Sequence, residues 1–459
     1  MKAVKGLSFL LAMLMLLVCV SGCGSDESKP TKMPAVSSTT TVVTENSTTV
    51  PSSETTVTEA PTTSVTEPSD SVSTAAATTT TSLSAADRKT TTVTKAKPSS
   101  TTVKPTPTTT APTKPKPPAK PVTLTALPST AYYGYRHLTQ TVSASDKYVA
   151  AYQRVVDGIE TMAESIVLED VGITDQQLKV VMRCYHADYP HHFWYNGAYS
   201  YVTNSSGTVL SVKPTYTMTA QQQQAAQPKM EAAVQELLKK AAYGQTEYER
   251  ELILHDELAV RVKYTEGANA HNMYGALVEG KAVCEGYARA FQYLLYRAGI
   301  ECLFVEGTSV RPGGTKGEAH AWNVVKIGGK YYHTDVTWDD QSGAAVSVMH
   351  AFFNSTDALI NEGHTVSADN PYPIPTCNAT ADSYFVREGT EMATFSVDKV
   401  VELFTKGNGT ATVYVSQKSV NEFIAWFQDN ISAISTKAKL AGKTFSLQYC
   451  GREVVIITK

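Results

Sequence analysis

The stretch Gly280-Lys281-Ala282-Val283-Cys284-Glu285-Gly286-Tyr287-Ala288-Arg289-Ala290-Phe291 decides how the centre of this chain folds. After it, apolar residues recur at the spacing of one helix face: Tyr287, Phe291, Leu294, Leu295 and Ala298. Gly299 follows as a helix-ending residue, so Cys284 lies at or just before a helix N-terminus. There the backbone N–H groups and the helix dipole favour thiolate over thiol. The position favours a nucleophile over a structural cysteine but does not establish one.

The next segment has the pattern of a β-hairpin. Residues 320–327 read as one strand, Gly328-Gly329 as a two-residue turn, and residues 330–337 as the returning strand. If Ile327 pairs with Lys330, the register of the whole hairpin follows. A slip of one residue would move every side chain to the opposite face.

This register brings a histidine and a carboxylate together. Trp322 then faces Asp335, so His320 and Asp335 are diagonal neighbours on one sheet face, close enough for their side chains to meet. A nucleophilic thiolate needs such a pair, a base and a group that orients it. His333 lies on the same face and is the alternative base, although it is less well placed, two residues from Asp335 along one strand.

Three blocks of residues resemble the transglutaminase-like superfamily, and in particular its bacterial extracellular members. They are residues 272–277 with 282–288, then 320–325, then 332–340, and the resemblance is strong over about 247–342. It implies an α+β fold: a papain-like transglutaminase core with N-terminal helices and a nucleophile helix packed on an antiparallel sheet. It also implies Cys284 as nucleophile, His320 as general base and then acid, and Asp335 as orienting group. Such a site attacks an amide carbonyl, forms a thioester and passes the acyl group to water or to an amine.

Further site residues are predicted on weaker grounds. The oxyanion in this family is usually held by the nucleophile's backbone N–H and one upstream side chain, for which Tyr274 is the candidate; a pocket-lining or core role is the alternative. Trp322 and Trp338 are expected to wall the cleft or pack beneath it. No calcium-binding loop pattern is present, and we expect no metal and no cofactor. The histidines between 186 and 192 match no zinc spacing and are interpreted as ordinary surface or core residues.

The first residues predict export. Residues 1–23 have a basic start, an apolar stretch and the ending Val20-Ser21-Gly22-Cys23, which resembles the lipobox of bacterial lipoproteins. In such proteins the cysteine carries the lipid, so Cys23 is the expected lipidation site, and the chain is expected on the outer face of the bacterial cell membrane. An ordinary signal peptide with a chance cysteine is the alternative.

Residues 24–122 hold 29 Thr and no Phe, Tyr or Trp, a composition typical of a disordered linker. We expect a helical N-terminal extension at 126–246, the catalytic core at 247–380 and a small α/β accessory module at 383–459. In the exported context, four cysteines could form two disulfides in three connectivities, or remain buried thiols: Cys184, Cys302, Cys377 and Cys450.

The formal net charge of −3 argues against a nucleic-acid partner. The expected partners are a peptide or protein substrate, including cell-wall peptide, and the membrane through the lipid at Cys23. The function that fits best is a tethered cysteine enzyme that hydrolyses peptide or isopeptide-type amides rather than cross-linking them. The alternative is a catalytically silent transglutaminase-like module that binds cell-wall peptide or a surface protein.

Overall fold

The computed structural model describes residues 42–44, 120–140, 143, 145–310 and 317–458. The predicted signal segment, Cys23 and most of the predicted linker lie outside these residues. Within the linker, however, Val42–Thr44 form strand β1, parallel to β3 (Tyr195–Thr203). Three consecutive β-branched residues suit an edge strand, which the overall composition of the linker conceals. In the part of the chain that is described, no helix is both long and apolar enough to cross a membrane.

The N-terminal elements combine helices with a four-stranded sheet in the order β1-β3-β4-β2. Besides β1 and β3 they are η1 (Ser129–Ala131), α1 (Tyr133–Gln140), α2 (Ser145–Glu160), β2 (Ile166–Val167), η2 (Glu169–Val171), α3 (Asp175–Asp188), β4 (Val209–Tyr216) and α4 (Ala220–Ala241). The sequence predicts a helix running on to Val167, and this is wrong. Met162 adopts a left-handed φ of 53°, and residues 166–167 pair with β4 instead.

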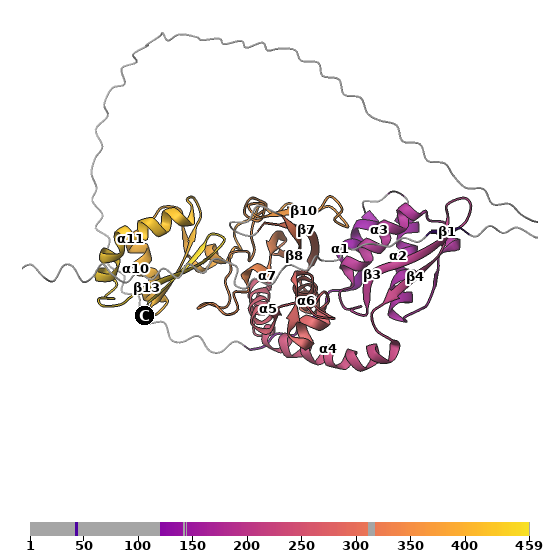
Figure 1. Cartoon of the computed structure of the whole chain (residues 1–459), viewed down its shortest axis with the longest axis horizontal. Helices are drawn as coiled ribbons and strands as arrows, with labels where there is room; N and C mark the ends of the chain where they lie inside the picture. The colour runs from indigo at the N-terminus through magenta and orange to yellow at the C-terminus, as the bar shows by residue number, and fades with distance from the viewer. Residues whose placement is uncertain (1–41, 45–119, 141–142, 144, 311–316, 459) are drawn as a thin grey trace, which may run out of the picture. The chain divides into compact units, whose positions relative to one another are not determined.

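The central elements surround a second antiparallel sheet, in the order β10-β7-β8-β9. They are α5 (Glu247–Arg261), β5 (Lys263–Tyr264), η3 (Gly275–Glu279), β6 (Lys281–Ala282), α6 (Cys284–Arg297), β7 (Cys302–Ser309), β8 (Glu318–Ile327), β9 (Lys330–Thr334), α7 (Val336–Asp339), α8 (Asp357–Ile360) and β10 (His364–Val366). Helix α6 packs against β8 and β7 (Figure 1). The fold is therefore α+β, as predicted, with α6, the helix that starts at Cys284, on an antiparallel sheet.

The last elements form a third sheet, in the order β11-β12-β14-β13, with two longer helices. They are α9 (Tyr384–Glu388), β11 (Glu391–Met392), α10 (Val397–Lys406), β12 (Thr410–Val415), α11 (Val420–Lys437), β13 (Phe445–Cys450) and β14 (Glu453–Thr458). They appear in yellow and light orange in Figure 1. This segment has its own hydrophobic cluster, built on Phe423 and Phe427.

Capping explains where several helices begin. The side chains of Thr174, Thr219 and Thr246 each accept a hydrogen bond from the backbone N–H three residues on. The Gln or Glu side chain of that third residue accepts a hydrogen bond from the backbone N–H of the threonine. The predicted boundaries at 246/247 and 380/383 stay predictions. The two larger hydrophobic clusters include residues on both sides of such a boundary, so the segments share core packing.

Candidate active site

Cys284 is the first residue of α6, directly after the N-cap residue Val283. The thiol is buried, with the residue 2% exposed. The segment before the helix lies tightly across its first turn, because Val283 donates a backbone hydrogen bond to Ala270 at 3.0 Å. Gly286 permits this approach: a Cβ there would lie 2.8 Å from that of Ala282 and closer still to the Ala270 carbonyl oxygen. The small residues Ala282 and Gly286 thus let the preceding segment pass close to the first turn of α6, where Cys284 lies.

The hairpin has the predicted register. Strands β8 and β9 pair from Ile327 with Lys330 to Asn323 with Thr334. The predicted length of the second strand is wrong, since β9 ends at Thr334 and not at residue 337. Asp335 instead caps α7 and accepts backbone N–H bonds from Thr337 at 3.0 Å and Trp338 at 3.2 Å through Oδ1. The carboxylate is therefore held by a helix start rather than by a ladder pair.

His320 and Asp335 meet. The Nε2 atom of His320 donates to Asp335 Oδ2 at 2.7 Å, and both residues are buried. The Cys284 side chain also contacts the His320 ring through a hydrogen bond. Because Nε2 is paired with Asp335, Nδ1 is the nitrogen that remains to face the sulfur. The structure thus brings the three residues predicted from sequence into one chain of contacts, sulfur to imidazole to carboxylate.

The electrostatics of this chain favour a charged imidazole. Burial lowers the pKa of His320, but the charge of Asp335, the neighbouring Cys284 and the hydrogen bonds to both raise it to about 10. Burial likewise raises the pKa of Asp335, yet His320, together with hydrogen bonds from His320 and His364, outweighs burial and holds that pKa well below its usual range. An imidazolium next to a cysteine at a helix N-terminus is an arrangement that favours thiolate.

The two tryptophans lie against His320, and Tyr274 packs on an aromatic residue of the N-terminal segment. The Trp322 ring is stacked at 6.0 Å between ring centroids, with an angle of 19°, and the Trp338 ring is at 5.9 Å. Trp322 is buried and Trp338 is partly buried. Tyr274 stacks on Phe193 at 5.3 Å and belongs to the second hydrophobic cluster. That location agrees with the core role given as its alternative, and its assignment to the oxyanion stays untested.

The alternative base, His333, is committed to other partners. Its Nδ1 accepts the indole N–H of Trp322 at 3.1 Å, so its proton is on Nε2, which donates to Asp357 at 3.0 Å. Burial lowers the pKa of His333, with Asp357 opposing the effect. The His333 ring is held by the Trp322 indole on one side and by the Asp357 carboxylate on the other. Its carboxylate partner is Asp357 and not Asp335, which favours His320 as the base.

One residue of the site gave no signal in the sequence. His364, at the start of β10, lies with its Nε2 atom 2.9 Å from the same Oδ2 of Asp335. Its ring centroid is 5.2 Å from that of His320 and 4.4 Å from that of Trp338. The residue belongs to no recognisable motif, and only the pairing of β10 with β7 brings it to the carboxylate.

Three groups of side chains in the described part of the chain have donor atoms close enough to hold a cation: His255 with Asp256 and His350, His320 with Asp335 and His364, and His333 with Asp357 and Cys377. Hydrogen bonds account for each. His333 would have to reverse its tautomer to offer Nε2 to a metal. His255 is held between Asp256 and Asp339. Burial lowers the pKa of His255, but these carboxylates raise it to about 10. The ring is therefore protonated and has no lone pair to offer a cation. The absence of a metal or cofactor from the reaction remains a prediction.

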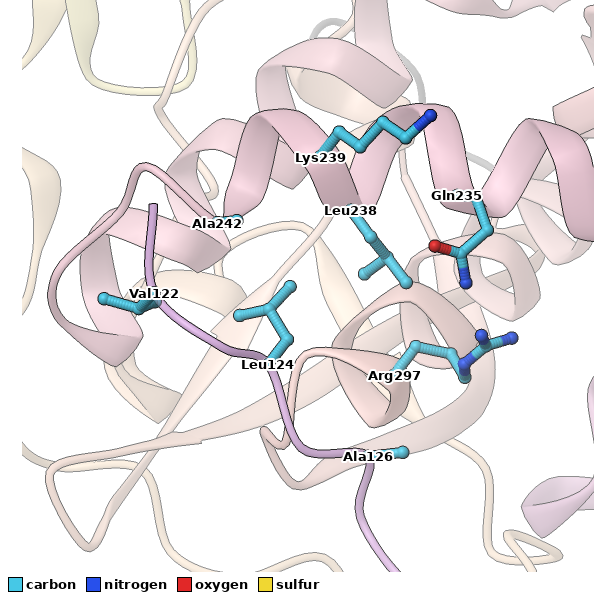
Figure 2. Close-up of a pocket in the computed structure, with 8 residues that line it drawn as sticks. All are labelled: Val122, Leu124, Ala126, Gln235, Leu238, Lys239, Ala242 and Arg297. Carbon is cyan, nitrogen blue, oxygen red and sulfur yellow. The ribbon is translucent and has the colours of Figure 1, made fainter. Parts of the chain in front are cut away.

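The five cysteines that the structure describes are buried, and none is in a disulfide. Of the two alternatives for Cys184, Cys302, Cys377 and Cys450, the structure therefore has the buried thiols. A crevice of about 330 Å³ lies apart from these residues, between the segment Val122–Ala126 and α4, and Arg297 closes one side of it (Figure 2). None of the candidate site residues lines it.

The comparisons with known proteins agree with the resemblance in the sequence. Residues 234–336 match the family model of the Transglutaminase-like superfamily. A 90-residue stretch is 31% identical to the Kyphoscoliosis peptidase of Mus musculus, covering 18% of this chain and 14% of that protein. A 64-residue stretch is 36% identical to the Kyphoscoliosis peptidase of Homo sapiens, covering 13% and 10%. The chain thus matches only a small part of the length of these relatives.

Among solved structures, a candidate cysteine protease from Cytophaga hutchinsonii is 21% identical over 24% of this chain and 37% of its own, with a TM-score of 0.20. A likeness at that score carries no argument about activity. Residues 234–336 of this chain are a domain of the transglutaminase-like superfamily.

Proposed function

We propose that this chain is a cysteine hydrolase that cleaves peptide or isopeptide-type amides. The observation that carries the proposal is the buried sequence of contacts from Cys284 through His320 to Asp335, at the start of α6. The Cys284 thiolate attacks the amide carbonyl carbon, and the imidazolium of His320 gives its proton to the departing amine. A thioester remains. Water then attacks the thioester with His320 as base, which releases the acid and restores the thiolate.

Several features support parts of this mechanism. The N-cap residue of α6, Val283, makes no side-chain capping hydrogen bond, and backbone N–H groups at a helix start are suited to stabilise an oxyanion. The pKa of His320, about 10, keeps the imidazole protonated at neutral pH, so the nucleophile and the proton donor are ready before substrate arrives. Hydrolysis is favoured over cross-linking because water reaches any open site, whereas transfer also needs a bound amine.

The proposed substrate and location follow from the N-terminal segment. A lipobox-like Cys23 followed by a Thr-rich segment without aromatic residues fits a domain held outside the bacterial membrane by a lipid, within reach of cell-wall peptide. Labelling of the expressing cells with a fatty-acid analogue tests the anchor: the wild-type chain should take up label and Cys23→Ala should not.

The decisive test of the enzyme proposal is the reactivity of Cys284 toward iodoacetamide near pH 7. We expect fast alkylation in the wild type, a loss of roughly 30-fold in His320→Ala, and a much smaller loss in His333→Ala, which removes the alternative base. Turnover of peptide libraries and wall fragments, with and without a labelled amine, separates hydrolase from transferase. A thiol that is equally slow in all three proteins, with no turnover, would leave the catalytically silent binding module as the better account.

A further inference from the structure

We propose that His364 is a positioning residue of the active site, which holds Asp335 in place and adds a positive charge beside the His320 and Cys284 pair. The proposal rests on the function proposed above. His364 is buried, 2% exposed, and is the first residue of β10. Strand β10 pairs with β7, His364 opposite Ser309, and β7 in turn pairs with β8, which carries His320.

Both ring nitrogens of His364 lie next to an acceptor. Its Nε2 lies 2.9 Å from the Asp335 carboxylate and its Nδ1 lies 3.2 Å from the carbonyl oxygen of Ile360. Both partners only accept hydrogen bonds. A neutral ring could donate to only one of them, whereas the charged ring that we propose donates to both.

Asp335 is therefore fixed from four directions. Its Oδ1 receives two backbone N–H groups from α7, and its Oδ2 receives His320 at 2.7 Å and His364 at 2.9 Å. Every lone-pair direction of the carboxylate is occupied, so the carboxylate cannot rotate away from His320. His364 contributes the one contact that comes from neither the hairpin nor the helix that follows it.

The charge of His364 changes the balance of the site. The His320 imidazolium and the Asp335 carboxylate cancel each other, so a second imidazolium leaves a net positive charge near Cys284. Three aromatic rings surround His364 and keep water away: Trp322, Trp338 and Phe352. The titratable groups that face His364 are Asp335 and His320, and its charge also acts on His333. Such a charge favours a thiolate at lower pH than the His320 and Asp335 pair alone would permit.

Gly307 explains how the two histidine rings can share one carboxylate. It lies on β7, opposite His320 on one side and Val366 on the other. A Cβ at Gly307 would lie 2.7 Å from the Trp322 ring and closer still to the carbonyl oxygen of Thr365. Without a side chain at this position, Trp322 lies across β7 beneath both rings.

Two variants test the proposal with iodoacetamide as the probe. His364→Ala removes both the contact and the charge, and His364→Gln can keep a hydrogen bond to Asp335 without the charge. At pH 6 we expect alkylation of Cys284 to fall about 10-fold or more in the alanine variant, with the glutamine variant between it and the wild type. At pH 9, where cysteines ionise unaided, all three should agree within about threefold. His137→Gln, the same change on α1, is the control and should behave as wild type.

The outcomes are separable. Equal losses at pH 6 and pH 9, or wild-type rates in both variants, would overturn the role of His364 while leaving the hydrolase proposal in place. A wild-type thiol that does not depend on His320 would overturn the hydrolase proposal instead. In that case, nitrogen NMR of the whole chain with labelled histidine still decides: a doubly protonated ring with hydrogen-bonded protons, lost in His364→Gln, is expected, and a neutral ring refutes the proposal.

Discussion

Replacing Asp335 with asparagine is expected to disable the nucleophile while leaving the fold intact. An asparagine oxygen can still accept the N–H groups of Thr337 and Trp338 that cap α7. Its amide NH₂ then takes the place of Oδ2 and faces His320. Two donors cannot meet, so His320 has to present a lone pair at Nε2 and carry its proton on Nδ1, the nitrogen that faces Cys284. A base with its proton on that side cannot accept another from the thiol.

The size of the effect follows from the charges. Asp335 is one of several causes, with Cys284 and the hydrogen bonds to both, that together raise the pKa of His320 to about 10 against the effect of burial. Coulomb's law gives about 4 kcal/mol for two unit charges 4 Å apart at an effective dielectric constant of about 20, and this is the order of magnitude lost with the carboxylate charge. For turnover, we expect a loss of roughly 10³- to 10⁴-fold.

For alkylation the limit is lower, since a thiol can ionise without help. At pH 6.5 an unassisted cysteine is only about 1% thiolate, so the expected loss is about 100-fold. The measurement is the iodoacetamide rate of Cys284 from pH 5 to 9.5. The wild-type rate should be nearly flat between about pH 6.5 and 9, and the rate of Asp335→Asn should climb about tenfold for each pH unit.

The matched control is Asp357→Asn, the same change at a carboxylate that contacts His333 instead of His320. It should keep the wild-type profile. An Asp335→Asn protein that is folded by its melting transition and circular dichroism, and that reacts within threefold of wild type at pH 6.5, would refute this role of the carboxylate.

Two further changes test the packing around the site. Burial raises the pKa of Glu251 to about 8. The stability linked to its proton is therefore complete below pH 4.5 and is lost as the pH rises through 8. At pH 9 the free energy of unfolding of Glu251→Gln should exceed that of wild type by on the order of 2 kcal/mol, and at pH 5 the two proteins should be equally stable. Gly307→Ala should destabilise the fold by about 1–3 kcal/mol and slow alkylation because its Cβ meets Trp322, whereas Gly267→Ala, with open space around it, should do neither in thermal melting and iodoacetamide assays.

Much of the site follows from local patterns. The apolar spacing after Cys284 is sufficient to predict a helix that starts at the cysteine, because helix periodicity and capping depend on neighbours within a few residues. The Gly328-Gly329 turn sets the register of the hairpin in the same way, and all the pairs from 327 with 330 to 323 with 334 agree with it. A two-residue turn leaves no freedom for a slip.

Other predictions failed where a tertiary contact decides. The strand after the turn was expected to reach residue 337, but the Asp335 side chain caps a helix and ends the strand, an outcome that alternating polarity does not predict. The expected role of Tyr274 at the oxyanion stays untested, but its ring packs on Phe193, a residue 81 positions earlier. Sequence distance carries no information about such a contact.

The sequence by itself therefore determined that Cys284, His320 and Asp335 meet, because one helix start and one tight hairpin carry all three. Only the tertiary structure decided which groups surround that carboxylate. His364 reaches Asp335 through the pairing of β10 with β7, and Gly307 leaves the space in which the rings meet. The physical reason is that hydrogen bonds within a turn or a helix depend on adjacent residues, whereas the charge balance of a buried site depends on every segment that the fold packs against it.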